Sequence, residues 1–331
     1  MTSFDTGLHL FQLGQVQDHV APNLADGLLP GGEIPGSGGL PAFSFQQSSV
    51  SPIPVLVAAP HGGRSYPPGL SARMRNPGPS GLRLEDRYAD LLALRLAQAT
   101  GAELVIAHAP RAMIDLNRSL DDMDWTMIEP PARDAGNTRS ESRRMRGGLG
   151  LIPRRLAGLG EIWKAPLPAA ELELRMQGIH RPYHERLQAI LATLQRRWGA
   201  ALLIDLHSMP PLVPGAANRT PAQVVLGDRF GASCVGTIAA AAFDEFAMQG
   251  IHAAHNRPYA GGYVLERHCN PSNGLHGLQL ELCRSLYLDA QLVEPGHGFD
   301  ATLAMLIRLV RRLADEVAVT ARGGVSALAA E

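Results

Sequence analysis

The stretch LLIDLHSMP, Leu202 to Pro210, decides the fold class of this chain. It begins as a continuous apolar run, which is typical of a strand buried on both faces of a sheet. Asp205, His207 and Ser208 follow before the run ends. Because buried polar groups need partners, these side chains indicate a site rather than core packing. In open α/β sheets such sites lie at the carboxyl ends of the strands.

Strands and helices alternate along most of the chain. The segment IPVLVAAPHGG (53–63) again places a histidine, His61, directly after an apolar strand. This alternation predicts an α/β fold, a single domain over residues 51–320 with a central mixed, mostly parallel sheet and helices on both faces. The predicted strands are 53–59, 103–109, 112–118, 200–206, 222–227, 262–266 and 277–283, and the predicted helices are 83–100, 169–198, 232–247 and 298–318.

Two segments fall outside this pattern. Residues 1–50 are expected to form an irregular N-terminal extension, and residues 120–168 a long insertion loop rich in Gly, Pro and Arg. Loops of this length are usually lids or binding loops. One of the loop's arginines is therefore a candidate to bind a substrate carboxylate, although a solvated basic loop is the alternative: Arg139, Arg143, Arg144 and Arg146.

The composition restricts the class of protein. The 331 residues carry a net charge of −1, so no overall field attracts nucleic acid or an anionic membrane. Hydrophobic residues make up 45% of the chain and charged residues 18%, which is enough apolar material for a sizeable core. Three cysteines without C-x-x-C spacing favour a reducing compartment. We therefore expect a cytoplasmic protein without nucleic-acid or membrane partners, and the oligomeric state stays open.

Several polar groups lie where predicted strands end and could form a hydrolytic centre. His61 and His207, with Asp86 from the start of the 83–100 helix, make the donor set of a catalytic zinc ion with one open position. Glu281 lies inside an apolar strand and could serve as the base, and Arg118 could hold a carboxylate or polarise a carbonyl. Taken singly, each histidine could equally be structural and Asp86 a helix cap.

At these residues the chain resembles the N-formylglutamate amidohydrolases, a family similar to the zinc carboxypeptidases and aspartoacylases. The resemblance implies a zinc-carboxypeptidase-like (phosphorylase/hydrolase-like) fold and a hydrolase that removes an N-formyl or related N-acyl group from an acidic amino acid. The stretches that carry it are APHGGRSYP (59–67), EDRYADLL (85–92), RAMIDLNRS (111–119), RPYHERL (181–187), LIDLHSMP (203–210) and RHCNPSNGLHGLQLELCRSLYLD (267–289).

The resemblance also implies roles for individual residues. His61, Asp86 and His207 would be the metal ligands and Glu281 the general base and acid, while the remaining family positions would bind substrate: Asn117, Arg118, Arg267 and His276. Arg64 stands where zinc carboxypeptidases have a glutamate ligand. Asp86 is therefore expected to supply the carboxylate, with Glu85 as the alternative.

The substrate is the open part of this hypothesis. N-formyl-L-glutamate, cleaved to L-glutamate and formate, is the substrate that the resemblance favours, with one zinc ion per chain. A metal-dependent amidase or peptidase acting on another N-blocked amino acid or small peptide is the first alternative. A non-catalytic amino-acid-binding relative is the second, although such a protein would need neither the metal set nor the buried base.

Overall fold

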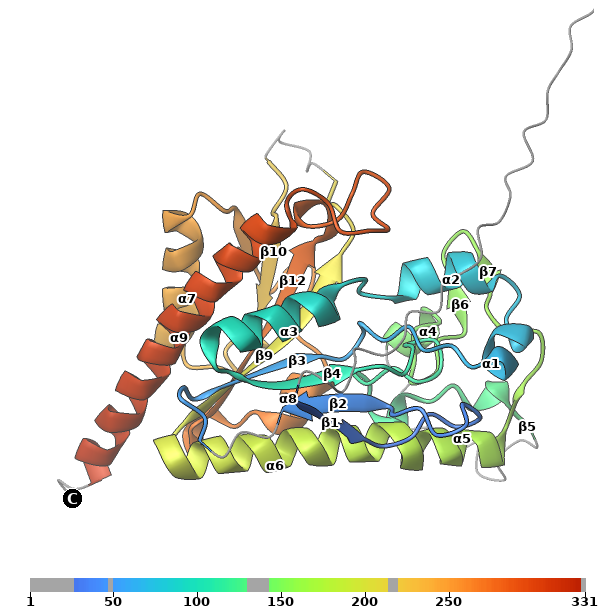
Figure 1. The fold of residues 1–331 in the computed structure, drawn as a ribbon, viewed down its shortest axis with the longest axis horizontal. Coiled ribbons are helices and arrows are strands. Elements are labelled where there is room, and N and C mark those ends of the chain that lie inside the picture. Colours follow the sequence, from blue (N-terminus) through green and yellow to red (C-terminus); the bar gives the residue numbers. More distant parts are fainter. Residues whose placement is uncertain (1–26, 47–49, 130–142, 214–219, 329–331) are drawn as a thin grey trace, which may run out of the picture.

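An eight-stranded sheet forms the centre of the molecule in the computed structural model (Figure 1). The structure describes residues 27–46, 50–129, 143–213 and 220–328. Strands β4, β3, β9 and β12 are mutually parallel neighbours, whereas β10 pairs antiparallel with β12. The prediction of an α/β fold with a mixed sheet is confirmed. In sheet order the strands are β1 (Leu28–Gly31), β2 (Phe43–Gln46), β4 (Glu103–Ala107), β3 (Val55–Ala59), β9 (Ala201–Met209), β12 (Leu275–Cys283), β10 (Val224–Gly227) and β11 (Ala253–His255).

Helices cover both faces of this sheet (Figure 1). One face packs against α3 (Ala89–Thr100), α7 (Gly236–Met248) and α9 (Phe299–Leu328). The other face packs against α6 (Arg181–Trp198), together with α5 (Ala169–Arg175) and α8 (Tyr263–His268).

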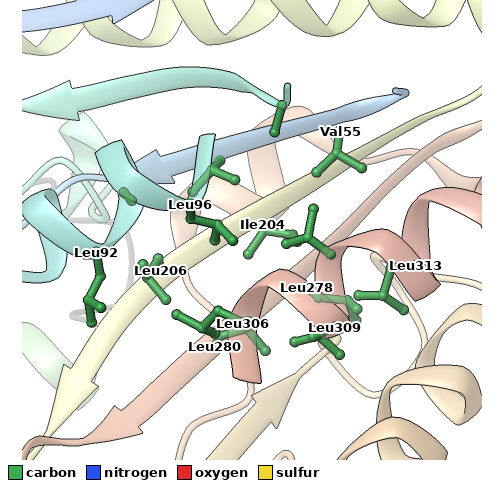
Figure 2. Packing of buried hydrophobic residues seen from close by; sticks show 14 of the residues in the cluster. Val55, Leu92, Leu96, Ile204, Leu206, Leu278, Leu280, Leu306, Leu309 and Leu313 are labelled. Atoms are coloured by element: carbon green, nitrogen blue, oxygen red, sulfur yellow. The ribbon is translucent and has the colours of Figure 1, made fainter. Parts of the chain in front are cut away.

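Strand β9 belongs to both hydrophobic cores, which explains its uninterrupted apolar run. Ile204 and Leu206 pack with residues of α3, β12 and α9 on one face (Figure 2). Leu203 points to the opposite face and packs with the α6 side. All nine residues of β9 are buried, so its polar members lie in the interior as well.

Three predicted elements differ from the observed ones. The 83–100 helix is two helices, α2 (Pro77–Leu84) and α3, separated by a turn that carries Asp86. The predicted strand 112–118 is a series of turns, because the Asp115 carboxylate accepts a hydrogen bond from the Asn117 amide at 2.8 Å and competes with strand pairing. The predicted strand 262–266 is helix α8, because a short apolar run does not by itself distinguish a strand from a buried helix.

The two segments outside the predicted pattern contain ordered structure. Residues 28–31 and 43–46 of the expected irregular extension form β1 and β2, which extend the sheet beyond β4. The described part of 120–168 includes short elements, and its Met123, Ile128 and Leu151 are buried in the α6-side core.

The remaining elements are α1 (Pro68–Arg73), α4 (Arg143–Arg146), β5 (Ile128–Glu129), β6 (Arg155–Leu156), β7 (Gly160–Glu161), β8 (Leu167–Pro168), a π-helical turn (Met176–His180) and the 3₁₀ turns Leu120–Asp122, Trp125–Met127, Pro271–Asn273 and Arg284–Leu286. Among the described helices, none has the length and apolarity needed to cross a membrane.

Candidate active site

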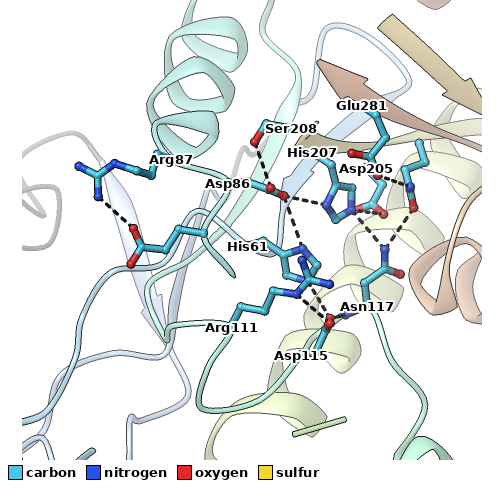
Figure 3. A network of polar contacts seen from close by, with 12 residues as sticks. His61, Asp86, Arg87, Arg111, Asp115, Asn117, Asp205, His207, Ser208 and Glu281 are labelled. Carbon is cyan, nitrogen blue, oxygen red and sulfur yellow. Dashed lines mark hydrogen bonds and ion pairs between the residues drawn. The ribbon is translucent and has the colours of Figure 1, made fainter. Parts of the chain in front are cut away.

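The two predicted histidine ligands and the predicted aspartate ligand meet at one buried point. His61 lies just after β3, Asp86 in the turn between α2 and α3, and His207 near the end of β9 (Figure 3). One potential ligand atom from each of them lies within 4.8 Å of the others. Adjacent parallel strands therefore bring together residues that are far apart in the sequence.

The atoms that face one another are two imidazole nitrogens and one carboxylate oxygen. Asp86 Oδ2 lies 2.9 Å from His207 Nδ1 and 3.5 Å from His61 Nδ1. Within the described part of the chain, the buried His61 Nδ1 has no hydrogen-bond partner. An imidazole nitrogen that is buried and unsatisfied needs an electron-pair acceptor. Two nitrogens and one carboxylate oxygen are a donor set that suits a divalent metal such as zinc.

The far nitrogens of both imidazoles are held by buried carboxylates. His61 Nε2 lies 2.7 Å from Asp115 Oδ1, and His207 Nε2 lies 2.9 Å from Asp205 Oδ2. Asp115 and Asp205 are fully buried. A carboxylate at Nε2 favours the proton on that nitrogen, so Nδ1 of each ring would be free to bind a metal once the ring is neutral. A carboxylate behind each imidazole is the arrangement found for metal-ligating histidines.

Asp86 is oriented in a comparable way. Ser208 donates a hydrogen bond of 3.0 Å to Asp86 Oδ1, and the Arg284 guanidinium lies 3.6 Å from the same oxygen. These contacts leave Oδ2 directed at the histidines. Glu85, the alternative carboxylate, instead accepts a hydrogen bond of 3.0 Å from Arg87. The structure therefore places Asp86, and not Glu85, in the ligand set.

The centre contains buried carboxylates whose acidity is strongly perturbed. Burial favours the neutral form of Asp86, but the hydrogen bond of His207 and the nearby His61 imidazole outweigh it and hold the pKa of Asp86 well below its usual value. Burial likewise opposes ionisation of Asp115, yet Arg111 and Arg118 hold its pKa well below the usual value. For His207, the adjacent Asp205 and Asp86 overcome burial and raise the pKa well above its usual value. A buried pocket of this kind attracts a cation.

Glu281 lies beside the ligand set with a perturbed acidity. It pairs with His207 in the register of β12 and β9, so the two side chains emerge next to each other on one face. Burial raises the pKa of Glu281 to about 7, opposed by His207 and reinforced by Asp86. Gln279 donates a hydrogen bond of 2.8 Å to Glu281 Oε1. A carboxyl group that titrates near neutrality suits a general base and acid.

Both ends of the Asn117 amide are used inside the protein. Its Nδ2 donates to Gln279 Oε1 at 3.1 Å and lies 3.3 Å from His207 Nε2, while its Oδ1 accepts from the Val264 amide at 2.9 Å. Gly262 makes this approach possible, because a Cβ at that position would come within 2.3 Å of Asn117 Oδ1. The structure thus places Asn117 as a support for His207, behind the ligand atoms.

The arginine that faces the site is Arg111. Arg118 is buried and donates to two backbone carbonyls, Leu149 O at 2.9 Å and Asn117 O at 2.6 Å. Arg111 donates through Nε to Asp115 at 2.9 Å, which leaves its two terminal NH₂ groups for another acceptor. Burial opposes a rise in its pKa, but Asp115, Asp86 and Glu281 together raise it. Arg111 therefore lies within electrostatic reach of both the metal site and the base.

The two secondary candidates from the family stretch lie away from this centre. His276 pairs with Leu202, at the opposite end of β12 from Glu281. It also points to the other face of the sheet, with the even-numbered leucines of β12. Neither its face nor its strand end meets the ligands, and a substrate-binding role for His276 stays a prediction. Arg267 is exposed on α8 and donates to the Tyr263 hydroxyl at 2.8 Å.

The arginines of the lid hypothesis are described only in part. Arg139 lies outside the described residues, and so do the side chains of Arg143 and Arg144. Arg146 is exposed in α4. Their role in binding a substrate carboxylate stays a prediction.

The sequence analysis missed three residues of the site. Asp115 and Arg111 both lie in the stretch RAMIDLNRS (111–119), for which only Asn117 and Arg118 were predicted as site residues. Gln279 precedes Glu281 by two residues, as Asp205 precedes His207. Strand alternation puts such residues on the same face, and this spacing was the signal that could have found Gln279.

Comparison with known proteins agrees with this geometry. The sequence model of the N-formylglutamate amidohydrolase family matches residues 53–288. The N-formylglutamate deformylase of Pseudomonas aeruginosa is 28% identical over 263 residues, which cover 78% of this chain and 90% of the relative. That of Pseudomonas putida is 29% identical over 260 residues, 75% of this chain and 85% of the relative. The crystal structure of N-formylglutamate amidohydrolase from Ralstonia eutropha JMP134 aligns with a TM-score of 0.74 at 29% identity, covering 83% of this chain and 98% of that one.

Proposed function

Because this chain belongs to the N-formylglutamate amidohydrolase family, we propose that it hydrolyses N-formyl-L-glutamate to L-glutamate and formate. The observation that carries the proposal is the juxtaposition of a buried His61–Asp86–His207 group with Glu281 in the next strand. A metal site beside a carboxyl group that titrates near neutrality suits the hydrolysis of an unactivated amide. The choice of N-formyl-L-glutamate as the substrate rests on the relatives named N-formylglutamate deformylase.

We propose one zinc ion per chain, held by His61, Asp86 and His207. The unsatisfied His61 Nδ1 and the carboxylates at both Nε2 atoms support this assignment. When bound, zinc supplies Lewis acidity, which makes water a competent nucleophile near neutral pH. The carboxylates that orient both imidazoles favour its retention.

The chain's own residues would perform the proton transfers. The ionised Glu281 accepts a proton from the attacking water and delivers it to the amide nitrogen as the C–N bond breaks. Each turnover thereby returns Glu281 to its starting state and releases formate and the free amine of glutamate. The terminal NH₂ groups of Arg111 are the donors available to the developing negative charge on the formyl oxygen. We therefore assign this role to Arg111, since Arg118 is bonded to backbone carbonyls.

A substrate panel tests the proposed function. The zinc-loaded protein is expected to release formate from N-formyl-L-glutamate with a higher kcat/KM than from N-formyl-L-aspartate, and to cleave N-acetyl-L-aspartate more slowly still. A clear preference for one of the other two substrates would favour the alternative amidase. Zinc binding without cleavage of any panel member would favour the non-catalytic alternative.

The acid limb of the pH profile should depend on Gln279. The base must be ionised, so kcat/KM rises with pH as Glu281 loses its proton. Replacing Gln279 by Met removes a hydrogen bond that favours the charged carboxylate, which raises the pKa of Glu281. We expect the acid limb to move to higher pH by roughly one unit. Gln249→Met, directly after α7, is the control with an unchanged limb. Coinciding profiles for Gln279→Met and wild type would contradict the assignment of Glu281.

A further inference from the structure

One short segment touches both candidate ligand histidines from behind. The turn Asp115–Arg118 places the Asp115 carboxylate 2.7 Å from His61 Nε2 and the Asn117 amide 3.3 Å from His207 Nε2. The turn lies outside the sheet, so strand pairing does not hold it in place. The orientation of the His61 imidazole therefore depends on whatever fixes this turn, whereas Asp205 of β9 holds His207.

A buried histidine that the proposed reaction does not use contacts the turn directly. His180 ends the π-helical turn before α6 and is fully buried. Its Nε2 lies 2.9 Å from the Arg118 carbonyl oxygen. Because a carbonyl oxygen can only accept, His180 must donate from Nε2. Among the described residues its Nδ1 has no hydrogen-bond partner, so one tautomer of the neutral ring is defined.

Neighbouring rings keep His180 in this orientation. The His184 ring lies 4.4 Å away between centroids, and the Tyr263 ring is stacked at 5.9 Å. His184 Nδ1 in turn lies 2.9 Å from His268 Nε2 on α8. Burial lowers the pKa of His180 to about 4, so the ring is neutral under ordinary conditions. The stretch RPYHERL, which supplies His184, thus packs behind the metal centre rather than in it.

We propose that His180 is a positioning residue for the metal centre: its Nε2–H fixes the Asp115–Arg118 turn and thereby orients the ligand nitrogen of His61. This inference rests on the proposed metal-dependent function. A π-helical turn supports it, since such turns often occur where a side chain must be placed for function. His180 itself is not expected to touch the substrate.

The test compares three variants in a zinc-competition assay with a chromophoric chelator, alongside kcat and KM. His180→Phe keeps the ring volume but loses the donor, and we expect a loss of about 10-fold or more in zinc affinity, as for other groups that orient metal ligands. A fall in kcat with little change in KM should accompany it. His180→Gln can present an amide N–H near the position of Nε2 and should restore most of the affinity. Leu191→Ala, a buried core position of α6, controls for lost stability and should keep the wild-type affinity.

The outcomes separate this inference from the proposed function. If His180→Phe binds zinc as tightly as the wild-type protein, the positioning role is wrong while the metal centre stands. If the wild-type protein itself fails to bind zinc, the proposed centre is wrong. Should His180→Phe not fold, His180→Asn replaces it, because its shorter amide cannot reach the Arg118 carbonyl. Equal affinities of His180→Asn and His180→Gln would then overturn the inference.

Discussion

Replacing Glu281 by Gln is expected to lower kcat for N-formyl-L-glutamate by about 10²–10⁴-fold, the usual contribution of general acid–base catalysis, without loss of zinc. Glutamine keeps the shape of the side chain but cannot accept the proton of the attacking water. Glu281 is not among the three ligands, so the metal site should stay intact. The neutral amide also suits the buried position, where burial already raises the pKa of Glu281 to about 7.

The measurement pairs single-turnover or steady-state formate release with metal analysis of the same samples. Glu245→Gln is the matched control, because Glu245 is also largely buried but lies on α7 and bonds to Gln249. It should keep the wild-type kcat. Near-wild-type turnover in Glu281→Gln would exclude Glu281 as the base and leave the metal site without an identified proton acceptor.

Replacing His207 by Ala is expected to remove both the metal and the activity. The change deletes one of three ligands and leaves Asp86 and Asp205 without their imidazole partner. Even groups that only orient a ligand contribute about 10–100-fold in affinity, so loss of the ligand itself should exceed about 100-fold. After dialysis against a weak chelator, the variant should contain little zinc and release no measurable formate.

His276→Asn provides the control for this experiment. His276 is buried like His207 and lies on the neighbouring strand, but it points to the other face and to the other strand end. Its replacement can reduce stability without removing a ligand, so the zinc content should stay at one per chain. Full zinc retention in His207→Ala would instead show that the ligand set has been misassigned.

The fold could be predicted to a large extent because its strands carry strong, local signals. The run at 53–59 is apolar on both faces and so is the run at 200–206 except for Asp205, and a sheet covered by helices on both sides buries them. The errors fell on short segments such as 112–118 and 262–266. In both segments the short apolar run was compatible with a strand or a helix. The Asp115 hydrogen bond to the backbone favours turns at 112–118, and residues 262–266 instead pack as part of α8.

The sequence predicted which residues belong to the candidate site better than it predicted the role of each one. His61, His207 and Glu281 stand out because a polar group in or next to an apolar strand is costly to bury. The sequence could not show that Arg118 donates to two backbone carbonyls while Arg111 lies near Asp86 and Glu281. Arg111 and Arg118 lie seven positions apart in a segment of turns. Because turns have no regular periodicity, the sequence does not predict the direction of either side chain.

By itself, the sequence determined the α/β class and the strand ends that carry the chemistry, because these follow from local apolar runs and from the polar residues that end them. The family followed from the resemblance of its motif stretches. The opening stretch LLIDLHSMP already placed Asp205 and His207 on one face of a buried strand. Only the tertiary structure decided which atoms face the centre. Asp115 reaches His61 across 54 positions of sequence, and Ser208 reaches Asp86 across 122. Such contacts depend on how separate elements pack, and it is these contacts that direct both Nδ1 atoms and Asp86 Oδ2 to one point.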